Sequence, residues 1–291
     1  MTDGSKELRA IVLGARGTLG QSLVEELPRQ GWAVVATVAR AECDVRDVDA
    51  VRALVASARP DVIFNAAAYT DVDKAETESD AAYAVNAIAV QGIARVADET
   101  GAALVHYSTD FVFDGELERP YDEFDPPSPQ GAYARSKRAG EILAAAATSR
   151  LYTVRVGCLY GRGGRNFPST IVRRLRAGET VRADRDRLGS PTWVRDVSRV
   201  SASLARSRAF GTYHCTSQGE TSWADFARFA AAELGLPEGR VEALPTSALP
   251  MKAPRPRRAI LDNLMLRLRG FAPMPDWQAA ARGFMEDEAR R

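Results

Sequence analysis

A tyrosine and a lysine four residues apart, Tyr133 and Lys137, have side chains and a spacing that suit proton transfer. On a helix this spacing places both side chains on one face, one turn apart. A neighbouring ammonium favours the phenolate, so we expect Lys137 to lower the pKa of Tyr133 and make it a better proton donor near neutral pH. Such pairs also occur on solvated helix faces without any function. The pair therefore predicts acid catalysis only together with further features of the chain.

Two hydroxyl residues, Ser108 and Thr109, end an apolar run over residues 104–108 that is typical of a buried strand. In open α/β sheets, side chains at the carboxyl ends of parallel strands point into the crevice where ligands bind. Asp110 follows directly, and residues 115–129 then hold four prolines and five acidic residues. A segment of this length is expected to be a lid or a positioning loop rather than a linker.

A glycine-rich turn with the pattern G-x-x-G-x-x-G spans Gly14, Gly17 and Gly20. It lies between an apolar strand over residues 9–13 and a helical stretch over residues 21–30. In this context the glycines allow a tight turn and a close approach of the backbone to a pyrophosphate, which the helix N-terminus then attracts. The alternative is a plain glycine-rich turn between strand and helix. The context favours a dinucleotide site.

The choice of dinucleotide depends on the end of the second strand, residues 32–38. In dinucleotide-binding folds an acid there binds the ribose hydroxyls and disfavours a 2′-phosphate. No acid stands at this position, whereas Arg16 and Arg40 flank it, and Glu42 and Asp44 come later. We therefore expect NADPH, with NADH as the alternative, although either arginine could be merely solvated. Asp44 is placed to meet the adenine or to cap the next helix.

The remaining pattern alternates strand and helix up to about residue 156, which predicts an α/β fold with a doubly wound parallel sheet. The strand over residues 60–65 is apolar throughout and runs into Ala66-Ala67-Ala68, where small side chains leave room for a ligand. We expect a dinucleotide-binding Rossmann domain over residues 1–160 and a smaller, mainly substrate-binding α/β lobe over residues 161–291. Residues 194–215 are expected to return to the first domain. Several arginines of the second half suit a phosphorylated substrate, unless they are only solvated.

Composition narrows the function classes. Lys and Arg (39) nearly balance Asp and Glu (38) in the 291 residues, so nothing in the net charge favours nucleic acid or a membrane. The polar N-terminus predicts no signal peptide, and the odd number of cysteines, at unrelated spacings, predicts neither a disulfide scaffold nor a zinc site. We therefore expect a cytoplasmic protein. His106 and His214 lie in apolar runs and are expected to be structural.

Seven stretches together resemble one family, the dTDP-4-dehydrorhamnose reductases among the extended short-chain dehydrogenases/reductases, over nearly the whole chain. The stretches are Gly14–Gly20, Pro60–Glu76, Ala82–Ala87, Ser108–Gly115, Tyr133–Glu141, Gly189–Thr192 and Arg255–Asp262. The resemblance implies hydride transfer from a nicotinamide to the C4 ketone of a nucleotide-activated sugar. It implies that Tyr133 protonates the developing alkoxide, that Lys137 holds the nicotinamide ribose and tunes Tyr133, and that Thr109 hydrogen-bonds the carbonyl oxygen.

The resemblance and the glycine turn together imply a cofactor site that also includes Tyr133 and Lys137. Its other expected members are Gly14, Arg16, Gly17, Thr18, Leu19, Gly20, Arg40, Asp44, Val45, Ala66, Ala67, Ala68, Tyr69 and Thr70. On the substrate side the resemblance implies Asp110, Asn166 and Phe167, and we add Cys158 and Arg187 because they depart from the family pattern. The acids that hold a magnesium ion in some relatives have no clear counterpart, so we predict no metal.

The two departures concern the sugar rather than the hydride chemistry. Many relatives have R-T-x-W-x-Y-G where this chain has Arg155-Val156-Gly157-Cys158-Leu159-Tyr160-Gly161, so Cys158 replaces the tryptophan that lies against the sugar. Relatives usually have D-Q where this chain has Asp186-Arg187. The leading hypothesis is reduction of dTDP-4-dehydrorhamnose to dTDP-L-rhamnose. The alternatives are a reductase of another dTDP-4-keto-deoxysugar, or a non-catalytic subunit resembling the regulatory subunit of methionine adenosyltransferase. A monomer or a homodimer is expected.

Overall fold

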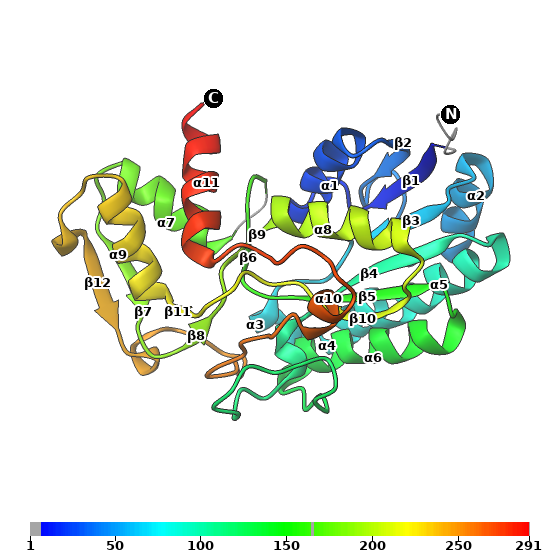
Figure 1. The fold of residues 1–291 in the computed structure, drawn as a ribbon. Coiled ribbons are helices and arrows are strands. Elements are labelled where there is room, and N and C mark those ends of the chain that lie inside the picture. Colours follow the sequence, from blue (N-terminus) through cyan, green and yellow to red (C-terminus); the bar gives the residue numbers. More distant parts are fainter. Residues whose placement is uncertain (1–6, 164–165, 291) are drawn as a thin grey trace.

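The computed structural model describes residues 7–163 and 166–290 and has a six-stranded parallel sheet at its centre (Figure 1). The strand order is β10-β5-β4-β3-β1-β2, so the order reverses next to β1, and this is the doubly wound α/β fold that the sequence predicted. The strands are β1 (Leu8–Leu13), β2 (Trp32–Val38), β3 (Val62–Asn65), β4 (Ala103–Thr109), β5 (Leu151–Val156) and β10 (Gly211–His214).

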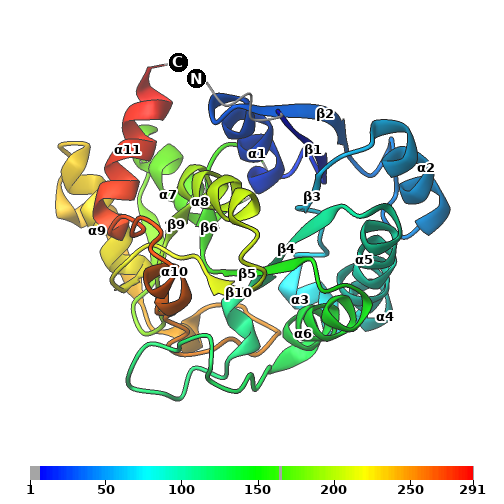
Figure 2. The same cartoon turned by 45° about the vertical axis from the view of Figure 1, so that its right-hand side comes forward.

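Helices cover both faces of the sheet, because alternate residues of each strand face two separate cores. Ala10 and Val12 of β1 belong to one core, and Ile11 and Leu13 belong to the other. Figure 2 shows α1 (Thr18–Arg29) and α8 (Val194–Ser207) on one side of the sheet, with α2 (Val48–Ala58), α5 (Ala89–Thr100) and α6 (Gly131–Ala147) on the other. Strands that are buried on both faces explain the continuous apolar runs in the sequence.

Most of the second half of the chain forms a smaller lobe, which is drawn on the left of Figure 1. Residues 194–214 lie with the large sheet instead, because α8 packs on α1 and β10 extends the sheet beside β5. The division of the chain near residue 160 stays a prediction. The elements of the lobe and its connections are α7 (Phe167–Arg176), α9 (Trp223–Glu233), α10 (Leu264–Leu268), α11 (Trp277–Ala289), β6 (Leu159–Tyr160), β7 (Val181–Asp184), β8 (Leu188–Gly189), β9 (Thr192–Trp193), β11 (Thr221–Ser222) and β12 (Val241–Leu244).

The predicted helix over residues 79–99 is interrupted, and here the sequence interpretation was wrong. The chain forms α4 (Ser79–Tyr83), then one π-helical turn, η1 (Ala84–Ile88), and only then α5. A neighbouring helix lies close at this turn, where Gly140 of α6 packs directly against the backbone carbonyl of Asn86. A side chain at position 140 would overlap that carbonyl oxygen. Such π turns are frequent at functional sites, because they reorient one side chain within a helix.

Both histidines, which we expected to be structural, are fully buried. Burial lowers the pKa of His106 and lowers that of His214 to about 3, so both rings are neutral at physiological pH. Within the two described ranges, no helix combines the length and the apolar composition that a membrane span requires.

Candidate functional site

Three of the predicted residues meet at the carboxyl edge of the sheet. Thr109 is the last residue of β4 and pairs with Val156, the last residue of β5. Tyr133 lies in the first turn of α6, where its ring packs edge-on against the Phe111 ring with the centroids 6.0 Å apart. Lys137 follows one turn later and is 2% exposed. The helix thus brings the tyrosine and the lysine to the same strand end that carries Thr109.

The pKa of Tyr133 moves opposite to the sequence-based expectation. Burial raises it to about 12, and the neighbouring Thr109 hydroxyl offsets only part of this rise. The ammonium of Lys137 donates instead to the backbone carbonyl of Tyr107, at 2.6 Å, and does not lower the pKa of Tyr133. A tyrosine with this pKa carries its proton at neutral pH. It is therefore ready to donate to an alkoxide, which is a much stronger base.

A buried ion pair between Glu141 and Arg155 lies near the ammonium of Lys137. Burial lowers the pKa of Lys137 to about 8, and the Glu141 carboxylate one turn further along α6 counteracts this. Glu141 accepts two hydrogen bonds from Arg155 of β5, each 2.9 Å long, and a third of 2.6 Å from Arg138. Burial alone would raise the pKa of Glu141, but the Arg155 hydrogen bonds hold it below its ordinary value. The lysine thus retains a negative charge nearby that favours its protonated form.

Asp110 lies directly against Thr109 and is 4% exposed. The Thr109 hydroxyl donates to Oδ1 of Asp110 at 2.9 Å and accepts from the Phe111 N–H at 3.2 Å. Gly157, just after β5, makes room for this carboxyl, because a Cβ at that position would stand 2.6 Å from Oδ2 of Asp110. Burial raises the pKa of Asp110 to about 7, and the Thr109 hydroxyl counteracts part of the rise.

Cys158 and Arg187, which depart from the family pattern, lie on the same side of the site as Asp110. The pKa of the Cys158 thiol is raised by burial and by the Asp110 carboxyl, whereas Arg187 lowers it. The backbone of Cys158 has a φ of +50°, and its Sγ packs so tightly on Gly189 that a Cβ there would be 2.6 Å away. Arg187 donates to Oδ2 of Asp184 at 2.5 Å. Part of its charge is therefore already neutralised within the protein.

The glycine turn has the shape that a pyrophosphate site requires. Gly14 has a φ of +77°, and a Cβ there would stand 2.6 Å from the backbone nitrogen of Ala67. A side chain on Gly20 would overlap the Gly14 carbonyl oxygen, so the helix packs close to the strand. Gly17 caps α1 without a side-chain hydrogen bond, which leaves N–H groups of the first turn available. Backbone donors at an open helix N-terminus fit the pyrophosphate of a dinucleotide.

The charges near the end of β2 are more balanced than the sequence indicated. Arg16 forms an ion pair with Glu42, whose other oxygen accepts from the backbone N–H of Ala39 at 2.9 Å. Arg40 approaches Asp44 at 3.6 Å. No acid stands at the strand end in the sequence, as predicted, but a short turn brings the carboxylate of Glu42 back to it. The side chains of Arg16 and Arg40 are 74% and 80% exposed, so each would have to give up only a surface ion pair to turn toward a phosphate.

The sequence did not single out Asn86 of the π turn, which lies between two parts of the candidate site. Its side-chain oxygen accepts from the N–H of Tyr69 at 2.8 Å, and its amide donates to the Tyr69 carbonyl and to the Ser136 hydroxyl, both at 3.0 Å. Asn86 therefore fixes the loop after β3 to the helix that carries Tyr133. The sequence places Asn86 within the stretch Ala82–Ala87, but only the π turn shows where its side chain points.

Other predicted residues are less directly placed at the site. Leu19 and Val45 have buried side chains in two different cores, so only their backbones are available to a cofactor. Ala66, Ala67 and Ala68 are half-buried beside the glycine turn, whereas Thr70 is exposed.

The two substrate residues predicted near α7 are occupied within the smaller lobe. Asn166 caps α7 by accepting from the Ser169 N–H at 3.0 Å. Phe167 is 41% exposed and packs edge-on against Trp223 of α9. Thr18, at the start of α1, donates to the carbonyl of Gly163 and so joins the glycine turn to the loop before α7. Gly163 thus lies beside the glycine turn, shortly before α7 begins in the smaller lobe.

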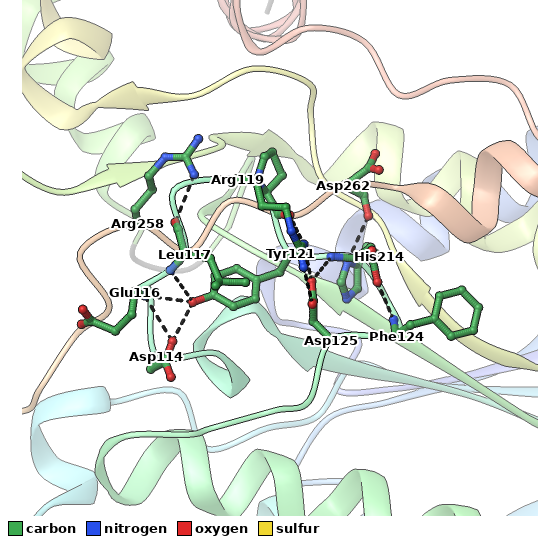
Figure 3. A network of polar contacts seen from close by, with 12 residues as sticks. Asp114, Glu116, Leu117, Arg119, Tyr121, Phe124, Asp125, His214, Arg258 and Asp262 are labelled. Carbon is green, nitrogen blue, oxygen red and sulfur yellow. Dashed lines mark hydrogen bonds and ion pairs between the residues drawn. The ribbon is translucent and has the colours of Figure 1, made fainter.

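Several polar contacts hold the acidic, proline-rich loop over residues 115–129, and Tyr121 makes a group of them, as Figure 3 shows. The buried hydroxyl of Tyr121 accepts from the N–H groups of residues 115–117 at 2.9–3.1 Å and donates to Asp114 at 2.6 Å. The backbone of Tyr121 also bridges Leu261, in the segment after β12. Of the two expected roles, a lid or a positioning loop, this packing favours the second.

Comparisons with known proteins agree with this geometry. The family model described as the RmlD substrate binding domain matches residues 8–290. The chain is 37% identical to the dTDP-4-dehydrorhamnose reductase of Burkholderia thailandensis, covering 94% of this chain and 96% of that protein. It is 39% identical to a dTDP-4-keto-6-deoxy-D-glucose reductase of Streptomyces niveus, covering 94% of each.

Solved structures of dTDP-4-dehydrorhamnose reductases are also similar to this chain. A dTDP-4-dehydrorhamnose reductase from Bacillus anthracis in complex with NADP is 35% identical, has a TM-score of 0.92, and covers 97% of this chain and 99% of its own. An ortholog from Clostridium acetobutylicum is 33% identical with a TM-score of 0.91, covering 97% of this chain and all of its own. The chain therefore belongs to the dTDP-4-dehydrorhamnose reductase family of extended short-chain dehydrogenases/reductases.

Proposed function

We propose that the protein reduces the C4 ketone of a nucleotide-activated 6-deoxysugar with a hydride from NADPH, and that dTDP-4-dehydrorhamnose is the first substrate to test. The observation that carries the proposal is the meeting of Thr109, Tyr133 and Lys137 at the sheet edge where the glycine turn also opens. Relatives named as dTDP-4-dehydrorhamnose reductases and a similar structure holding NADP support it. NADH remains the alternative reductant.

In this reaction the residues of the chain would bind the cofactor, orient the ketone and supply the proton. The open N-terminus of α1 and the glycine turn would hold the dinucleotide, which supplies the hydride when bound. Tyr133, protonated at neutral pH, would transfer its proton to the sugar C4 oxygen. Lys137 would bind the nicotinamide ribose through its ammonium, and Thr109 would orient the ketone oxygen. Asn86 would hold the loop after β3 in register with Tyr133.

A second candidate substrate is another dTDP-4-keto-deoxysugar for an antibiotic or a surface glycan. Cys158 favours it, because its small thiol offers no aromatic face to a sugar ring. If this candidate is right, Cys158→Trp should shift kcat/KM toward dTDP-4-dehydrorhamnose. An unchanged ratio of kcat/KM values between the two sugars would count against it.

The decisive assay follows NADPH oxidation with a panel of dTDP-4-keto-6-deoxysugars. Removing the phenolic proton with Tyr133→Phe should lower kcat by about 100-fold or more, because general acid catalysis contributes on this scale. Cofactor binding, measured by the fluorescence of bound NADPH, should change little and serves as the control for folding. If the wild type shows no turnover above that of Tyr133→Phe with any sugar, the proposal fails.

We further propose that the enzyme works in the cytoplasm as a monomer or homodimer and binds no nucleic acid. All three cysteines are unpaired, which fits a reducing compartment. The formal net charge of +1 gives no reason to expect a nucleic-acid partner. Sedimentation of the purified protein would decide between monomer and dimer.

A further inference from the structure

The Thr109 hydroxyl already has a partner for its only proton. It donates to Oδ1 of Asp110 at 2.9 Å, and one of its lone pairs accepts from the Phe111 N–H at 3.2 Å. A hydroxyl has one proton to give. While this proton is held by the Asp110 carboxylate, Thr109 has none to offer to the oxygen of a substrate ketone.

The carboxyl of Asp110 is built into the site rather than left in solvent. It is 4% exposed, and Gly157 leaves the space that it fills. The groups that face it are the phenol of Tyr133 from α6 and the thiol of Cys158 from the connection between β5 and β6, with Arg187 acting on Cys158 from further away. Within the part of the chain that the structure describes, no cation forms an ion pair with Asp110.

We propose that Asp110 is a positioning residue whose protonation decides whether Thr109 can hydrogen-bond the substrate ketone. When Asp110 is ionised, Thr109 donates to it and faces the ketone with a lone pair only. When Asp110 is neutral, its own O–H donates to Oγ1 of Thr109, and the Thr109 proton turns toward the ketone oxygen. The proton on Asp110 comes from solvent and is not consumed in the reaction. This inference rests on the proposed reductase function and concerns its regulation by pH.

The proposal predicts how the rate depends on pH. Because burial raises the pKa of Asp110 to about 7, the neutral form is common at pH 6 and scarce at pH 8. A single group with this pKa lowers kcat by about tenfold between pH 6 and pH 8. Lys137, whose burial lowers its pKa to about 8, loses half its charge at pH 8 and adds a further loss of about twofold. The wild type should therefore lose about 20-fold in all.

The test compares kcat across pH 6–8 for the wild type, Asp110→Asn and the control Glu116→Gln. The asparagine amide imitates the neutral acid by donating to Thr109 at every pH, so the variant should lose only about twofold, from Lys137. Glu116 is an exposed carboxylate in the nearby loop, and its removal should leave the 20-fold loss unchanged. An Asp110→Asn variant with the full wild-type loss would overturn the proposal. So would a raised KM with an unaltered kcat profile, because Asp110 would then only bind the sugar.

Two further measurements keep the test decisive if the asparagine variant does not fold. A flat wild-type kcat between pH 6 and pH 7.5 overturns the proposal without any variant. The carboxyl of Asp110 can also be titrated by 13C NMR in labelled protein without substrate, and Thr109→Val should raise its pKa because the Thr109 hydrogen bond lowers it. No response to Thr109→Val contradicts the proposal. An active enzyme with the wrong profile thus differs from a failure of the proposed function, in which no sugar is reduced at all.

Discussion

Replacing Lys137 with methionine should show how much folding stability the protein loses by burying the charge of this residue. Lys137 is 2% exposed, and burial lowers its pKa from the ordinary 10.5 to about 8. The folded state therefore binds the lysine proton less tightly than the unfolded state does. At pH 7 the difference between the two pKa values corresponds to about 3 kcal/mol of stability lost to the buried charge.

The sign of this effect fixes its pH dependence. The cost is fully present below the folded-state pKa of about 8 and disappears as the pH rises toward 10.5, where the unfolded chain also releases the proton. Between pH 7 and pH 9.5 the free energy of unfolding of the wild type should therefore rise by about 2 kcal/mol from this residue. The Lys137→Met variant lacks the ammonium and should not show this rise. At pH 7 alone the comparison is less informative. Methionine also loses the hydrogen bond to the Tyr107 carbonyl, which is worth about 1.5–3 kcal/mol and offsets the relief.

The measurement is urea-induced unfolding of both proteins, free of cofactor, at pH 7 and pH 9.5. The exposed Lys252 provides a matched control, because Lys252→Met removes an ammonium that has no burial cost. The stability difference between the wild type and Lys137→Met should change by about 2 kcal/mol between the two pH values, and that for Lys252→Met should stay constant. A constant difference for Lys137→Met as well, within about 0.5 kcal/mol, would refute the burial argument. The variant should also be inactive in the reductase assay.

Three further substitutions test the structure at other points. Gly14→Ala should abolish NADPH binding and cost about 1 kcal/mol or more in urea unfolding, because φ is +77° and the new Cβ meets Ala67. Glu141→Gln should cost about 3–5 kcal/mol, because it leaves Arg155 buried without its anion. Tyr121→Phe should cost about 1–3 kcal/mol and make the loop over residues 115–129 cleavable by protease, because the N–H groups of Gly115 and Leu117 lose their acceptor, whereas that of Glu116 keeps Asp114.

Each of these has an outcome that contradicts it. Normal NADPH affinity in Gly14→Ala would mean that the cofactor binds away from the glycine turn. A Glu141→Gln variant as stable as the wild type would mean that water reaches Arg155 and replaces the lost anion. If Tyr121→Phe is cleaved no faster than the wild type, the loop is held by its other contacts, such as the bridge between Tyr121 and Leu261.

Much of the fold could be predicted because the burial of each strand and the shape of each tight turn leave a local pattern in the sequence. The apolar runs of β1, β3 and β4 mark strands that are buried on both faces, and the glycines after β1 mark a turn that no side chain can occupy. The π turn at Asn86 could not be predicted in the same way. The turn packs against Gly140 of another helix, and no pattern within residues 79–99 contains that contact.

The sequence by itself determined which groups stand at the site. The spacing of Tyr133 and Lys137, the hydroxyl at the end of β4 and the glycine turn predict a proton donor, a cation, a carbonyl partner and a pyrophosphate site. Only the tertiary structure decided their pKa values and their ion pairs. Burial raises the pKa values of Tyr133 and Asp110, and Glu42 returns to pair with Arg16. Desolvation and ion pairing depend on which distant segments surround a group, and sequence spacing does not contain that information.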